Sequence, residues 1–176
     1  MAFIKKTKNR LLSAIRSELC RMDARFVAAG AIIVLVSGVL SAIAAGGTSL
    51  YGDIELPSAA PPAIVFPIVW TVLYILIGGS AGAIAGVKDR CVEADKYKGL
   101  LFFVIMMVFN FVWSPLFFGA QAFVAAFAAI VMMIILTFFV IVFFSRIFKI
   151  TAFIMGIYLA WLFFAAYLNL AVIILN

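Results

Sequence analysis

The chain contains 176 residues, of which 68% are hydrophobic and 11% are charged, whereas a soluble domain is about half apolar and about a quarter charged. This composition excludes a water-soluble fold and indicates a protein that lies in a membrane. The net charge of +6 does not indicate nucleic-acid binding, because seven of the 13 Lys and Arg precede residue 26 and the others lie between apolar stretches, a pattern that orients a membrane protein.

Residues 1–25 form a basic segment in which apolar side chains recur every three to four positions. These side chains are Leu11, Ile15, Leu19, Met22 and Phe26. The spacing predicts a basic amphipathic helix on the inner membrane surface. A helix this short is marginal in isolation, so a solvated leader that only sets the topology is an equal alternative. A cleaved signal peptide is disfavoured, because the apolar run that follows exceeds the usual length of about 7 to 15 residues.

Five apolar stretches follow, each long enough to cross about 30 Å of hydrocarbon as a helix. They run over 26–46, 62–87, 98–120, 122–145 and 151–175. We therefore predict an all-α fold, an integral membrane five-helix bundle that forms one domain over 26–176 and is preceded by a juxtamembrane segment over 1–25. The segments before, between and after the stretches carry seven, none, four, none, two and none of the Lys and Arg. The positive-inside rule then predicts a cytoplasmic N-terminus and an outer C-terminus, in a bacterial plasma membrane.

Three glycines recur every fourth residue in the second stretch, at Gly78, Gly82 and Gly86. Such spacing places them on one helix face and lets another backbone come close. The approaching helix can belong to the same bundle or to a second copy in a homodimer, and the sequence favours the same bundle because internal contacts outnumber oligomeric ones.

The interior of the five stretches contains no Asp, Glu, Lys, Arg or His. Such residues mark ion paths and proton relays in membranes, so a proton-coupled pump is not expected. Without a carboxylate pair, or a base beside a hydroxyl, hydrolysis and group transfer are also not expected. Cys20 and Cys91 are too few and too far apart to indicate a metal site.

Aromatic and amide residues instead share helix faces in the second, third and fifth stretches. They are Trp70 with Tyr74, Asn110 with Trp113 and Ser114, and Tyr158, Trp161, Ala165 and Asn169. The predicted orientation puts the tryptophans roughly 10 Å or more from the outer span ends, which is too deep for a headgroup belt. Each asparagine could form a hydrogen bond between helices instead, but the clustering favours a cavity with aromatic walls and a few polar groups. The proline-rich segment that precedes the second stretch is expected to be stiff and to form a lid over this cavity.

Three segments carry a resemblance to a known family. They are PSAAPP over 57–62 with Val69-Trp70 and Leu73-Tyr74, NFVWSPLFFG over 110–119, and Tyr158-Leu159-Ala160-Trp161 with Leu168-Asn169. They resemble the first loop and the second, third and fifth helices of the TspO/translocator proteins, also called tryptophan-rich sensory proteins or peripheral benzodiazepine receptors. The resemblance implies a five-helix bundle in the lipid bilayer, commonly a homodimer, whose pocket binds porphyrins such as protoporphyrin IX beneath the first loop.

Carried onto matching positions, the resemblance implies a set of ligand-binding residues and a lid. The ligand-binding residues are Trp70, Tyr74, Asn110, Trp113, Trp161, Ala165 and Asn169, and the lid residues are Tyr51, Pro57, Pro61 and Pro62. No metal and no obligatory cofactor are expected, and a tetrapyrrole is expected as the ligand.

The chain also departs from the family pattern. Ala59 and Ile64 replace tryptophans of the lid, Ala129 replaces an acidic residue of the fourth helix, and the usual arginine near Gln121 is missing. Leu170 and Ile174 replace the tyrosine and the basic residue of the sterol-recognition pattern, so sterol binding is not expected.

We expect the protein to be a receptor or sensor. One alternative is a facilitator that moves porphyrin across the membrane without a coupled ion. The other is light-dependent porphyrin degradation, in which Trp70 and Trp161 would be the reactive residues.

Overall fold

The structure, a computed structural model, describes residues 12–13, 15–46 and 54–176. Over these residues it consists of helices and connecting turns, and five of the helices are long and apolar enough to cross a membrane. They are α2 (Ala24–Ala44), α3 (Val65–Ala85), α4 (Glu93–Ser114), α5 (Phe123–Ser145) and α6 (Lys149–Leu175). The predicted all-α five-helix bundle is therefore confirmed, and each predicted stretch overlaps one helix.

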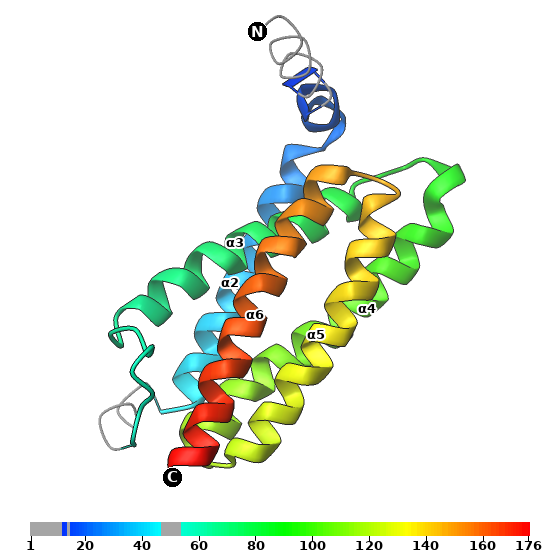
Figure 1. Cartoon of the computed structure of the whole chain (residues 1–176). Coiled ribbons are helices and arrows are strands. Elements are labelled where there is room, and N and C mark those ends of the chain that lie inside the picture. Colours follow the sequence, from blue (N-terminus) through cyan, green and yellow to red (C-terminus); the bar gives the residue numbers. More distant parts are fainter. Residues whose placement is uncertain (1–11, 14, 47–53) are drawn as a thin grey trace, which may run out of the picture.

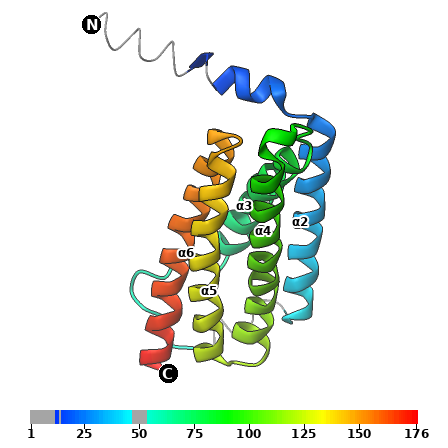
Figure 2. The same cartoon turned by 90° about the vertical axis from the view of Figure 1, so that its right-hand side faces the viewer.

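The five helices run up and down beside one another (Figures 1 and 2). α2 packs against α3, α3 packs against α6, and α5 packs against both α4 and α6. The starts of α2, α4 and α6 lie at one end of the bundle, near the N-terminal segment, and the C-terminus lies at the other end (Figure 1). The described Lys and Arg lie at or beyond the first of these ends, which we call the basic end.

The glycines of α3 allow its close approach to α2. A Cβ atom on Gly82 would overlap the carbonyl oxygen of Phe26, and one on Gly30 would overlap the carbonyl oxygen of Gly78. A Cβ atom on Gly86 would lie 3.2 Å from Cβ of Phe26. All three glycines of the repeat therefore face α2 of the same chain, as the within-bundle alternative requires.

The end of α4 departs from regular helical geometry. Pro115 has no N–H to continue the α-helical pattern, and residues Pro115–Gly119 form a π-helical turn, η3. Its wider ring is closed by the N–H of Ala120, which donates to the carbonyl oxygen of Pro115 at 2.9 Å. A connection through Gln121, whose φ is 52°, then leads into α5.

The N-terminal segment is fastened to the basic end of the bundle. Residues 15–21 are helical, and the Glu18 carboxylate accepts hydrogen bonds from the N–H groups of Lys149, at 3.1 Å, and Ile150, at 3.0 Å. These N–H groups belong to the first turn of α6, where intrahelical partners are lacking and where Phe148 provides no capping side chain. The guanidinium carbon of Arg21 lies 5.6 Å from the centre of the Phe148 ring. Neither alternative drawn from the sequence, a surface helix or a solvated leader, included this contact.

Candidate ligand-binding site

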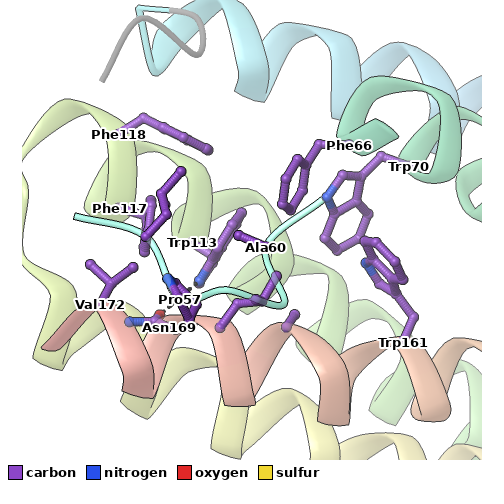
Figure 3. Close-up of a pocket in the computed structure, with 13 residues that line it drawn as sticks. Pro57, Ala60, Phe66, Trp70, Trp113, Phe117, Phe118, Trp161, Asn169 and Val172 are labelled. Carbon is purple, nitrogen blue, oxygen red and sulfur yellow. Dashed lines mark hydrogen bonds between the residues drawn. The ribbon is translucent and has the colours of Figure 1, made fainter. Parts of the chain in front are cut away.

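Five of the seven predicted ligand-binding residues line one cavity of about 30 Å³ at the end of the bundle opposite the basic end. They are Trp70, Trp113, Trp161, Ala165 and Asn169. Figure 3 shows Trp70 from α3, Trp113 from α4, and Trp161 and Asn169 from α6, around the chain segment that contains Pro57 and Ala60. Helices far apart in sequence therefore bring the predicted residues together.

A second cavity, of about 110 Å³, lies beside the first, on the α2 side. Tyr74 lines this cavity, together with Gly38 and Ala42 of α2. The two cavities share four ring-bearing side chains. These are Phe66, Trp70, Trp113 and Phe118. The rings form the partition between two parts of one aromatic site.

Trp70 stands at the centre of the aromatic cluster. Its ring centre lies 5.2 Å from that of Tyr74, 6.2 Å from that of Trp113 and 6.3 Å from that of Trp161. The rings of Trp70 and Trp161 are almost perpendicular, at 88°. Edge-to-face and offset contacts at such distances are favourable, and the same flat faces are suited to stacking against a flat ligand.

Asn110 lies below the cavities and lines neither of them. Its side-chain oxygen accepts a hydrogen bond from the Tyr74 hydroxyl at 2.8 Å, and its amide nitrogen donates to the Tyr158 hydroxyl at 2.8 Å. Asn110 is 2% exposed and Tyr158 is 0% exposed. The chain of bonds connects α3, α4 and α6, so Asn110 holds the floor of the site rather than facing its interior.

Asn169 lines the cavity, but its amide is also engaged by the protein. Its oxygen accepts from Nε1 of Trp113 at 3.3 Å, and its nitrogen donates to the carbonyl oxygen of Phe123 at 3.0 Å. The sequence left open whether each asparagine forms a hydrogen bond between helices. In the structure both asparagines form such bonds. Each amide nitrogen donates one of its two N–H groups in these bonds, and the orientation of a ligand by the two amides stays a prediction.

Trp161 carries a buried donor that the protein leaves unpaired. Its Nε1 is buried and, among the described residues, is the buried side-chain polar atom without a hydrogen-bond partner. The Trp161 ring lines the first cavity and lies beside the ring of Trp70 (Figure 3). A buried unpaired donor costs free energy, and an acceptor atom of a ligand in the cavity would remove that cost.

The lid prediction fits the structure only in part. Pro57 lines the first cavity together with Leu56 and Ala60. Pro61 and Pro62 line neither cavity and lead into α3, where the N–H of Val65 donates to the carbonyl oxygen of Pro62 at 2.9 Å. Tyr51 lies outside the described residues.

The segment over the cavity is fastened to the end of α6. The N–H of Glu55 donates to the side-chain oxygen of Asn176 at 3.0 Å, and the side-chain nitrogen of Asn176 donates to the carbonyl oxygen of Glu55 at 3.1 Å. Both bonds are exposed, so water can replace them. Release of the segment would therefore break these two exposed bonds and the partly buried packing of Ile54 and Leu56 against the core.

Several apolar lining residues were not identified from the sequence. They are Phe66, Phe117, Phe118, Leu168 and Val172, whereas Leu56 and Ala60, which also line the cavity, lie in the loop over 51–62 that was expected to cover it. Phe66 precedes Trp70 by four residues, and Leu168 and Val172 follow Ala165 and Asn169 by three, so the helical period already placed them on the same faces. Phe117 follows Trp113 by four residues and stacks on its ring with the ring centres 5.2 Å apart, and Phe118 follows Ser114 by four, so the same period also indicated these two.

The chemistry of the lining is aromatic and aliphatic. No residue that lines either cavity carries an ionisable acidic or basic side chain apart from the Tyr74 hydroxyl, and no group of three His, Cys, Asp or Glu that could hold a metal is found among the described residues. Such a site can stack against a flat apolar molecule.

Over most of its length, the chain is similar in sequence to proteins of one known family. The sequence model of the TspO/MBR family matches residues 27–175. The tryptophan-rich protein TspO of Chlorobaculum tepidum is 33% identical over 126 residues, which cover 72% of this chain and 78% of that protein. The tryptophan-rich protein TspO of Archaeoglobus fulgidus is 31% identical and covers 82% of this chain, and the protein CrtK of Rhodobacter capsulatus is 29% identical and covers 80%. With five apolar helices that can cross a bilayer, the chain is an integral membrane protein that belongs to the TspO/MBR family.

Proposed function

We propose that this protein is a membrane receptor that holds a flat apolar ligand of the tetrapyrrole class, such as protoporphyrin IX, among Trp70, Trp113 and Trp161. The observation that carries the proposal is the enclosed aromatic cavity with one unpaired donor, Nε1 of Trp161. The rings supply stacking faces, and a carboxylate or carbonyl oxygen on the ligand would accept the indole hydrogen bond.

Ligand entry requires side chains to move. The two cavities have about 30 Å³ and about 110 Å³ of free volume, whereas sites for drug-sized ligands have about 300 to 1,000 Å³. Rotation of Phe66 and Phe118 would join the two cavities, because both rings line both of them. Release of the segment that contains Leu56 and Pro57 from Asn176 would add room above. Binding is therefore coupled to an opening of this segment.

The proposed side of the membrane follows from charge. The cavities lie at the end of the bundle away from the described Lys and Arg, and positive charge is retained on the cytoplasmic side. The ligand would then enter from the outer side or from the outer leaflet. A receptor in this position can sample flat apolar molecules that partition into the bilayer.

The test is a titration of the purified protein in detergent with protoporphyrin IX, followed by the shift of the porphyrin absorption band. Trp70→Ala removes the central stacking face and is expected to weaken binding at least about tenfold, since each aromatic pair contributes about 0.5 to 1.5 kcal/mol beyond its buried area. Trp161→Phe keeps a ring but removes the donor and is expected to weaken binding by roughly two- to tenfold.

The matched control is Phe163→Ala, because Phe163 lies on α6 close to Trp161 but is 53% exposed on the outside of the bundle. It should bind protoporphyrin IX as the unmodified protein does. Equal affinity in the control and in both tryptophan variants would show that the porphyrin binds elsewhere.

A further inference from the structure

A large apolar groove lies at the basic end of the bundle, away from the aromatic site. It has about 440 Å³ of free volume. α2 and α6, which both pack on α3, form its walls, and Leu19 and Met22 of the N-terminal segment close it at the basic end. Small side chains keep it open. These are Ala24, Ala28, Ala31, Gly79 and Ala83. We call it the basal groove.

The basal groove is suited to hydrocarbon. Its two hydroxyl groups are already paired within their own helices: Ser80 donates to the carbonyl oxygen of Leu76 at 2.8 Å, and Thr151 donates to that of Phe148 at 2.8 Å. The remaining lining is aliphatic. From Ala24 to Ala31 the α2 wall extends for about 10 Å along the helix, so an acyl chain that lies parallel to the helices fits its shape.

Three basic residues are neighbours in sequence of residues that line the basal groove, and the guanidinium of Arg21 lies over the ring of Phe148, which directly precedes Lys149. Arg21 and Lys149 each directly precede a lining residue, and Arg25 directly follows one. The nearby carboxylates are already engaged, since Glu18 accepts from the first turn of α6 and Asp23 forms a salt bridge with Arg25 at 3.0 Å. Within the described residues, Arg21 and Lys149 form no salt bridge with a carboxylate.

We infer that the basal groove binds one anionic phospholipid, whose acyl chain lies against Ala28 and Gly79 and whose phosphate lies between Arg21 and Lys149. Basic groups beside a groove between transmembrane helices are the feature by which proteins select anionic headgroups. A second copy of this chain fits less well, because it would bring the same cations together in a low-dielectric contact. The Glu18 contact with α6 gives the site its structural basis, since it fixes the segment that carries Arg21, Leu19 and Met22.

The test measures the lipid retained by the purified full-length protein in native mass spectrometry after exposure to two lipids with identical acyl chains, phosphatidylglycerol and phosphatidylcholine. The unmodified protein is expected to retain more phosphatidylglycerol than phosphatidylcholine. Ala28→Phe fills the groove from α2 and should lower retention of both lipids at least fivefold. Ala29→Phe, the matched control on the neighbouring exposed position, should leave retention unchanged.

The charge is tested separately by the double variant Arg21→Gln and Lys149→Gln, which should lose roughly tenfold or more of the preference for phosphatidylglycerol. The control, Arg90→Gln with Lys98→Gln, removes two exposed basic groups that do not flank the groove and should keep the preference. The inference is overturned if both double variants show the same preference for phosphatidylglycerol, or if Ala28→Phe and Ala29→Phe retain the same amount of lipid. A dimer fraction that falls in Ala28→Phe while lipid retention is unchanged would assign the groove to a second copy instead.

Discussion

Asn110→Leu is expected to lower the free energy of unfolding by about 1 to 3 kcal/mol, because it removes the hydrogen-bond partner that two buried tyrosine hydroxyls share. Asn110 accepts from Tyr74 and donates to Tyr158, each at 2.8 Å. Leucine has a similar volume, so the lost hydrogen bonds rather than a cavity would dominate the change. The floor of the aromatic site would also lose its connection between α3, α4 and α6.

The measurement is thermal or denaturant unfolding of the purified protein in detergent. Tyr74→Phe is the graded control, because it removes one hydroxyl and one of the two bonds and should cost about half as much. Hydrogen bonds between membrane helices often contribute less to the free energy of unfolding than buried hydrogen bonds in soluble proteins. The reason is that the polar groups of unfolded helices in a membrane also find hydrogen-bond partners. If the Asn110→Leu variant is as stable as the Tyr74→Phe variant, the hydrogen bond between Asn110 and the Tyr158 hydroxyl does not contribute to stability.

Gly82→Ala is expected to separate α2 from α3 and to lower the yield of monodisperse protein severely. The added Cβ would overlap the carbonyl oxygen of Phe26, which is part of a helix backbone and cannot rotate away. Overpacking of this kind costs about 1 to 3 kcal/mol and sometimes more. A shift of α2 would also disturb the second cavity, because Gly38 of α2 faces the ring of Tyr74.

Gly156→Ala provides the matched control for this prediction. A Cβ atom on Gly156 of α6 would meet no atom within 4 Å, and alanine favours a helix more than glycine by about 1 kcal/mol. This control should fold at least as well as the unmodified chain. Size-exclusion profiles and thermal unfolding of the two variants give the comparison, and similar behaviour would mean that α2 and α3 are not in close contact.

The membrane spans could be predicted because they depend on local composition alone. A helix in hydrocarbon satisfies its own backbone groups, so a long apolar stretch defines the element without reference to its neighbours. The aromatic faces followed from the helical period in the same way, and the structure brings Trp70, Trp113 and Trp161 to one cavity. Their role in binding stays a prediction.

Other features depended on partners far away in the chain. Asn110 is 48 residues from Tyr158 and Glu18 is 131 residues from Lys149, so neither hydrogen bond leaves a pattern in the local sequence. For that reason the sequence did not decide between pocket lining and helix contact for the asparagines, and did not identify Glu18. Phe117 could have been found, because it follows Trp113 by four residues on the same helix face and stacks on its ring.

The most direct measurement is a crystal structure of the protein with protoporphyrin IX bound. It should place the macrocycle against Trp70, with an acceptor atom within hydrogen-bond distance of Nε1 of Trp161 and with the segment around Pro57 displaced from its position over the cavity. A macrocycle bound instead on the outer face between α2 and α4, near Leu40 and Leu116, with the rings of the aromatic site unmoved, would contradict the proposed site.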